Sequence, residues 1–113
     1  MAETLNPIKP KPQVFQLADL IEYQQGSVVS RQLLKKTAGN ITLFAFDAGE
    51  GLSEHTAPYD ALVQVLEGQA AITIEGTAYQ LAGGESIIMP AGQPHALKAE
   101  VPFKMVLTMI RSN

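Results

Sequence analysis

Hydrophobic and polar positions alternate in short runs along the chain after Gly26, and turn residues separate one run from the next. Short runs that are rich in β-branched side chains and bounded by glycine, proline or asparagine are typical of β-strands. The pattern predicts about eight or nine strands, most of them at residues 28–35, 41–46, 61–66, 70–74, 77–81, 86–89, 95–98 and 103–110. Strands that recur roughly every ten residues favour a single sandwich or barrel.

The last predicted strand shows which way its side chains face. Its apolar residues occur at every second position: Phe103, Met105, Leu107 and Met109. The positions between them include Lys104 and Thr108. Because successive side chains of a strand point to opposite faces, we expect one face of this strand to line a shared core.

The N-terminal residues differ from the rest, because their proline-bearing stretch NPIKPKP cannot join the centre of a sheet. We expect residues 1–13 to form an extended arm, either loose or laid across a neighbouring surface. Residues 14–113 are then the barrel domain. Within it, residues 18–23 carry the one helical signal and predict a single helical turn.

Composition places the chain among globular proteins and argues against several functions. Its 113 residues are 46% hydrophobic and 17% charged, which suits one folded domain. The net charge is −3 and the lysines and arginines are scattered, so no basic stripe is available to bind nucleic acid. The chain has no cysteine, which excludes disulfides and thiolate chemistry.

The sequence also gives expectations about location and assembly. No apolar run approaches the ~20 residues of a membrane-spanning helix, and the first residues lack the apolar centre of a signal peptide. We therefore expect no membrane partner and a cytoplasmic location. A chain this short buries only about two-thirds of its unfolded surface, so pairing into a homodimer would be a natural source of extra stability.

Two stretches have spacings that point to a family. The first is Gly49-x5-His55-x-Ala57-x3-Ala61-x6-Gly68, and the second is Gly84-x5-Pro90-x-Gly92-x2-His95-x3-Ala99. In the glycines, the proline and one histidine of each motif, the chain resembles the cupin family, as a small single-domain member with a cupin 2-type conserved barrel. The resemblance implies an all-β fold, the cupin jelly-roll β-barrel, commonly paired into dimers through a sheet edge.

The resemblance is incomplete at the positions that would bind metal. Metal-binding cupins use three imidazoles and one carboxylate, whereas here the second histidine position is Ala57 and the glutamate position is Ala61. Only His55 and His95 remain, and two ligands are fewer than a zinc site normally has. If residues 55, 57 and 61 share the inward face of a strand, the two alanines widen the pocket and make it more apolar.

One interpretation of the histidine pair is a weak metal site. His55 and His95 would bind a divalent transition metal (zinc, iron, nickel, manganese or copper), completed by water, by substrate or by a third side chain. Glu54, Tyr59 and Asp60 are near enough in sequence to be that third ligand. Simple alternation along the strand, however, points the two carboxylates away from the barrel.

Two further observations bear on this choice. Met105 and Met109 face inward, and two histidines with a methionine would suit copper, although methionine in a core more often fills gaps. The opposing interpretation is a metal-free pocket in which both imidazoles act as hydrogen-bonding or acid–base groups. Both interpretations stay open from the sequence.

The sequence supports three alternative functions. The first is a small-ligand-binding cupin of undefined pathway, with a pocket formed by His55, Ala57, Ala61 and His95. The second is a mononuclear metal-dependent oxygenase or isomerase with a nonstandard ligand set. The third is a non-catalytic dimeric interaction or sensory module, in which the N-terminal arm matters more than the pocket. The residues leave open whether the chain catalyses a reaction.

Overall fold

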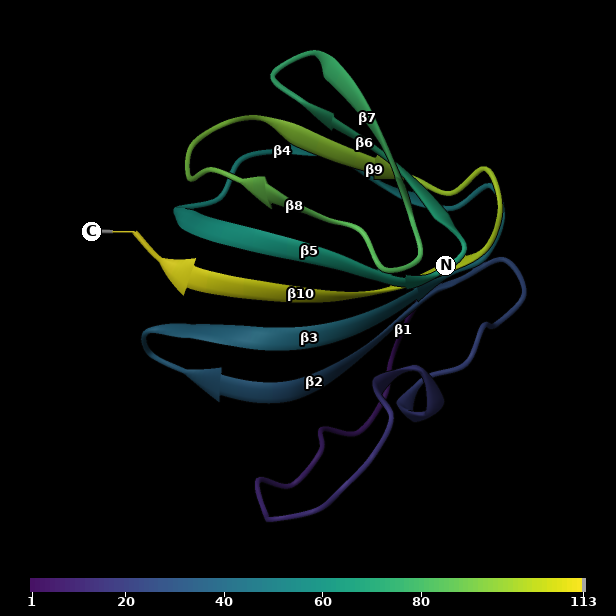
Figure 1. The fold of residues 1–113 in the computed structure, drawn as a ribbon, viewed down its shortest axis with the longest axis vertical. Helices are drawn as coiled ribbons and strands as arrows, with labels where there is room; N and C mark the ends of the chain where they lie inside the picture. Colours follow the sequence, from purple (N-terminus) through teal and green to yellow (C-terminus); the bar gives the residue numbers. More distant parts are fainter. Residues whose placement is uncertain (113) are drawn as a thin grey trace.

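The computed structural model describes residues 1–112 as two facing β-sheets and one short 3₁₀-helix, η1 (Leu17–Leu20). The strands are β1 (Ala2–Thr4), β2 (Val28–Lys36), β3 (Gly39–Phe46), β4 (Gly51–His55), β5 (Tyr59–Glu67), β6 (Gln69–Ile74), β7 (Thr77–Ala82), β8 (Ser86–Met89), β9 (His95–Lys98) and β10 (Phe103–Arg111). One sheet has the order β1-β2-β3-β10-β5-β8 and the other has the order β4-β9-β6-β7 (Figure 1). Within residues 1–112, no helix is long and apolar enough to cross a membrane.

The all-β class predicted from the sequence is confirmed. Each of the eight strands predicted by residue range is present, with ends that move by at most two residues. The structure adds β1 and β4, which the hydrophobic pattern did not predict. The only large apolar residue of β4 is Leu52. The segment therefore lacks the alternation of apolar and polar residues from which a strand is predicted.

Apolar side chains from both sheets fill the space between them. Phe46 and Phe103 are fully buried there, and their rings stack with centroids 4.5 Å apart. Met105 and Leu107 of β10 belong to the same core, as the alternation of that strand predicted. Stacked rings of this kind stabilise a core beyond the area that they bury.

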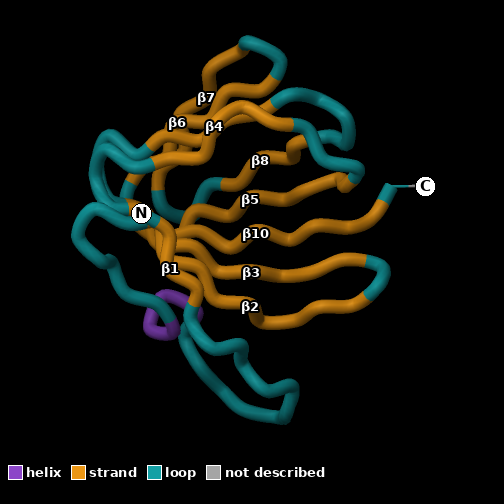
Figure 2. The backbone as a smooth tube through the Cα atoms, turned by 180° about the vertical axis from the view of Figure 1, so that it is seen from behind, coloured by secondary structure: helices purple, strands orange, loops and turns teal. Residues whose placement is uncertain are grey.

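A second apolar cluster lies on the outer face of the six-stranded sheet, on the side away from the core. Its buried members are Ile21, Val29, Leu43, Ala45 and Val106. Leu5 and the leucines of η1 pack against these residues, so the N-terminal part of the chain covers this part of the sheet. Figure 2 shows η1 beside the end of the sheet where β1 lies.

Lys104 of β10 lies under this cover. Alternation placed Lys104 on the face away from the core, but that face is not open to solvent here, and Lys104 is only 9% exposed. Its Nζ donates a hydrogen bond to the carbonyl oxygen of Ala18 over 2.7 Å and lies 5.2 Å from the centre of the Tyr23 ring. Residues 17–23 are called the covering segment below. The buried ammonium group of Lys104 therefore stabilises the packing of the covering segment on the sheet.

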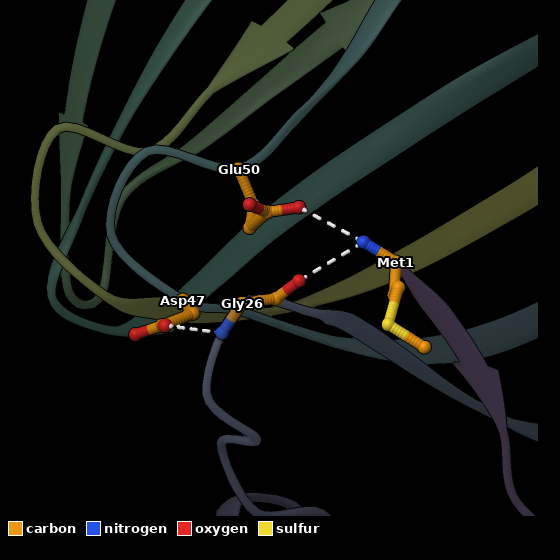
Figure 3. Close-up of polar contacts among 4 residues, drawn as sticks. All are labelled: Met1, Gly26, Asp47 and Glu50. Carbon is orange, nitrogen blue, oxygen red and sulfur yellow. Dashed lines mark hydrogen bonds and ion pairs between the residues drawn. The ribbon is translucent and has the colours of Figure 1, made fainter.

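The first residues of the chain lie along the edge of the barrel. β1 pairs in parallel with β2, and the backbone N–H groups of Leu5 and Ile8 continue the contact by donating to carbonyls of β2. The amino group of Met1 donates to the carbonyl oxygen of Gly26 over 2.9 Å and lies 3.6 Å from a carboxylate oxygen of Glu50 (Figure 3). The prolines begin only after β1, where no ladder hydrogen bond is lost to them.

Candidate functional site

The two histidines come from neighbouring strands of the four-stranded sheet, and a β-bulge brings them together. Leu52 of β4 pairs with Leu97 of β9, so regular pairing would set Glu54 opposite His95. The register instead shifts between Leu52 and His55, and His55 becomes the partner of His95. One extra residue in β4 has therefore reversed which side chains face inward, an effect typical of bulges beside functional sites.

The imidazole rings lie edge to face. Their centroids are 4.4 Å apart and their planes make an angle of 68°. His95 is buried, with 7% of its surface exposed, whereas His55 is an exposed residue. The pair therefore extends from the interior of the barrel to its surface, with His55 at the outer end.

Both rings are held in the same way by the backbone. Nδ1 of His55 lies 2.8 Å from the carbonyl oxygen of Ser53, and Nδ1 of His95 lies 3.0 Å from the carbonyl oxygen of Gln93. A carbonyl oxygen only accepts hydrogen bonds, so each Nδ1 carries the proton and donates it. In the neutral rings, Nε2 is then the nitrogen with a free lone pair.

The free nitrogen of His95 borders open space. Within residues 1–112, neither histidine has a hydrogen-bond partner at Nε2, and no fully enclosed side-chain nitrogen or oxygen is left unpaired. Because His95 itself is buried, its Nε2 must face a space into which a small group can reach. Both histidines line a small cavity.

The cavity has a volume of about 40 Å³, and the four pocket residues expected from the sequence lie on its wall: His55, Ala57, Ala61 and His95. Tyr59 lies between the alanines and contributes as well, since residues 55, 57, 59 and 61 alternate inward along one stretch of chain. The rest of the wall is apolar and consists of Leu52, Met89, Leu97, Met105, Leu107 and Met109. A cavity of this size holds roughly three water molecules.

The alanines make the wall apolar, as expected, but they do not open a wide pocket. Ligand pockets for drug-sized molecules measure about 300–1,000 Å³. Here the flexible side chains of Met89, Met105 and Met109 form part of the wall of a much smaller cavity. The enclosed site is therefore of a size for an ion or a small polar group.

The structure brings no carboxylate to the histidines. Asp60 is exposed and its Oδ1 accepts a hydrogen bond from the backbone N–H of Ala91 over 2.9 Å, outside the barrel. Glu54 is exposed and is not among the residues on the wall of the cavity. In residues 1–112, no three histidine, aspartate or glutamate side chains gather as a metal site.

Tyr59 is the one candidate third ligand that reaches the cavity wall, and its ring lies 6.0 Å from the guanidinium carbon of Arg111. Two imidazoles without a carboxylate do not fit the family's centre of three imidazoles and one carboxylate. The sequence singled out neither Met89 nor the bulge in β4. Met89 sits in an apolar run without any sign of a special role, and a bulge is defined by the partner strand.

Two sheets closed around one apolar core, with a histidine pair at one end, define a small barrel of the jelly-roll class. Residues 42–111 match the family described as the cupin domain. The chain therefore belongs to the cupin family. A comparison with curated proteins found no match.

Solved structures of similar proteins agree with this assignment. A conserved protein of unknown function from Streptococcus pyogenes is 36% identical, with a TM-score of 0.87 over 93% of this chain and 92% of that chain. A cupin superfamily protein from Desulfitobacterium hafniense is 31% identical, with a TM-score of 0.85 over 91% of this chain and 94% of that chain. A cupin 2 conserved barrel domain protein from Leptotrichia buccalis is 42% identical, with a TM-score of 0.84 over 86% of this chain and 47% of that chain, so this chain spans about half of it.

Proposed function

We propose that this chain is a small-ligand-binding cupin whose ligand places one compact polar group between Nε2 of His55 and Nε2 of His95. The observation that carries the proposal is the shared arrangement of the two rings. Each ring donates Nδ1–H to a backbone carbonyl, which leaves both Nε2 atoms for a ligand. The apolar wall around them strengthens any hydrogen bond or ionic contact made there.

The size of the cavity limits the ligand. About 40 Å³ accommodates only a few heavy atoms, so the rest of any organic ligand has to lie outside the barrel, past the exposed ring of His55. Ala57 and Tyr59 line the cavity with His55, are themselves partly exposed, and would contact that outer part. Such a ligand is recognised by its polar head inside and by its shape at the mouth.

The experiment is a thermal-shift screen of protein purified without chelators, with a panel of metal ions and small polar metabolites. At least one compound is expected to raise the melting temperature of the wild type, because a ligand that binds only the folded state stabilises it. The increase should disappear in His55→Gln and in His95→Gln, which keep a polar side chain but lose the imidazole lone pair. A panel that leaves the melting temperature unchanged, or an increase that survives in both variants, contradicts the proposal.

Cu(I) is a second candidate occupant, favoured by the composition of the wall. The cavity combines two imidazoles with the thioethers of Met89, Met105 and Met109 and has no carboxylate, and soft ligands of this kind select Cu(I) over hard cations. The Met105→Leu variant separates this candidate from an organic ligand. It should weaken stabilisation by Cu(I), kept reduced with ascorbate, and should leave binding of an organic ligand at the histidines intact.

A further inference from the structure

Arg111 is a charged residue at the end of a file of apolar side chains that lines the cavity. Leu107 and Met109 of β10 form part of the cavity wall. Because side chains of a strand alternate between its two faces, Arg111 lies on the same face as Met109 and nearer to the end of the strand. It pairs with Tyr59 of β5, and its guanidinium carbon lies 6.0 Å from the centre of the Tyr59 ring. Arg111 therefore extends the inner face of β10 beyond the enclosed cavity.

The histidines lie at the same end of the barrel as Arg111. His55 ends β4, His95 begins β9, Tyr59 begins β5 and Arg111 ends β10. Figure 1 shows these four strand ends on one side of the molecule, the side that carries the C-terminus. Tyr59 connects the two groups, because it lines the cavity and its ring also lies beside the guanidinium. An exposed positive charge thus stands outside a cavity whose wall contains two imidazoles and no carboxylate.

The charge of Arg111 is available to a ligand. In residues 1–112, no carboxylate lies within ion-pair distance of its guanidinium. Asp60 follows Tyr59 on β5 but alternates to the opposite face, where its Oδ1 accepts the hydrogen bond from the N–H of Ala91. A guanidinium presents parallel N–H groups that match a carboxylate, and this charge-assisted contact is stronger than a neutral hydrogen bond. Arg111 therefore favours a ligand whose outer end is a carboxylate.

The histidines require a different group at the inner end of the ligand. Each Nδ1 donates to a backbone carbonyl, so each neutral ring offers a lone pair at Nε2. A carboxylate only accepts hydrogen bonds and cannot satisfy these two atoms. A hydroxyl has a single proton and could donate to one ring, whereas a primary ammonium group has three N–H donors and can donate to both. The aromatic ring of Tyr59 on the cavity wall also suits a compact cation more than an anion.

We propose that the ligand is a short amino carboxylate, with its primary amine between the two Nε2 atoms and its carboxylate on Arg111. The inference rests on the proposed function and names the class of ligand for that site. The pair Tyr59–Arg111 lies two residues along the strands from the pair Ala61–Met109, which is a step of about 7 Å. Such a separation disfavours an amine on the carbon next to the carboxylate and favours a chain with several methylene groups between the two.

The test is calorimetric titration of the full chain with the series glycine, β-alanine, γ-aminobutyrate, δ-aminovalerate and ε-aminocaproate. At least one of the three longer members should bind more tightly than glycine, because its two ends reach both the histidines and Arg111. The matched ω-hydroxy carboxylate lacks the additional donors, and the matched amide lacks the negative charge. Each of these analogues should bind about tenfold or more weakly than the amino carboxylate.

The role of Arg111 has a test of its own. Arg111→Gln should weaken binding of the amino carboxylate by about tenfold or more and leave binding of its amide unchanged, because the amide makes no ionic contact. Arg111→Lys should retain part of the affinity, since lysine keeps the charge but not the parallel N–H groups. Lys98→Gln is the matched control, because it removes the same charge from an exposed residue of β9 that does not line the cavity. It should leave both affinities unchanged.

Several results would overturn the inference. They are a series in which no member binds, a hydroxy analogue or an amide that binds as tightly as the amino carboxylate, and an Arg111→Gln variant that weakens the amino carboxylate and its amide alike. A metal ion or another compound that stabilises the protein through both histidines, while the series does not bind, overturns the amino carboxylate and leaves the histidine site standing. A protein to which nothing binds through His55 and His95 overturns both proposals.

Discussion

At the scale of single residues, the chemistry of the candidate site is decided by two backbone carbonyls. The carbonyls of Ser53 and Gln93 each receive Nδ1–H from the histidine two residues later. Because each ring is oriented by the chain that carries it, the orientation does not depend on a bound ligand. Such an arrangement keeps Nε2 in position before a ligand arrives, which lowers the entropy lost on binding.

A pair of turn glycines gives a prediction at this scale. Gly68 and Gly76 have nearly equal positive φ angles of 80° and 79°, so alanine at either position costs about 1–2 kcal/mol for the backbone alone. A Cβ at Gly68 would also collide with the carbonyl oxygen of Pro102, while a Cβ at Gly76 would meet nothing within 4 Å. Gly68→Ala should therefore lower the free energy of unfolding by a further ~2 kcal/mol relative to Gly76→Ala. Urea unfolding of both variants measures the difference, and equal losses would contradict it.

The same two glycines show what sequence can predict about residues. Glu67-Gly68 and Glu75-Gly76 are the same dipeptide, and each stands between two of the strands that the sequence predicts. The close approach of Pro102 to one of them depends on how distant strands meet, which no local pattern contains. In the same way, the inward parity of Ala57 and Ala61 could be predicted, but the methionines that fill the adjoining space could not.

At the scale of elements, the strands that sequence predicts are those with alternating apolar residues. β10 and β5 are of this kind, whereas β4 is recognised only by its pairing with β9. The bulge in β4 follows from that pairing, so the residue that faces His95 could not be deduced from β4 alone. The packing of η1 on the outer face could not be predicted either. The sequence around Lys104 does not show that this residue contacts Ala18 and Tyr23.

The contact between the covering segment and the sheet predicts a pH dependence. Burial, and secondarily the hydrogen bond that Tyr23 Oη donates to Glu67 Oε2 over 2.7 Å, raise the pKa of Tyr23 well above its ordinary value near 10. A pKa raised in the folded state gives stability that is fully present below pH 10. That stability is lost as the pH rises further, because the unfolded chain releases the proton first.

The expected result is that Tyr23→Phe lowers stability at neutral pH and reduces its further decline above pH 10. Urea unfolding at a series of pH values from neutral to alkaline measures both effects. Tyr79→Phe is the matched control, since Tyr79 is 43% exposed on β7, and it should decline as the wild type does. An unchanged alkaline decline in Tyr23→Phe would show that the contact with Glu67 does not hold the covering segment.

At the scale of the whole molecule, one sheet serves two surfaces. The inner face of β5 and β10 lines the cavity beside the histidines, and the outer face of the same sheet is packed against the N-terminal part of the chain. The fold class could be predicted from strand rhythm and from the two motifs. The cluster on the outer face could not, because Leu5, Ile21 and Val106 lie far apart in sequence and meet only in the folded chain.

The central claim is that the space between His55 and His95 is a binding site. The most direct measurement is the electron density in that space, in a high-resolution crystal structure of protein purified without chelators. The account predicts an ordered group in contact with Nε2 of both rings, while each Nδ1 keeps its carbonyl partner. A space that contains only water, or rings turned so that Nε2 is bonded to the protein, would contradict it.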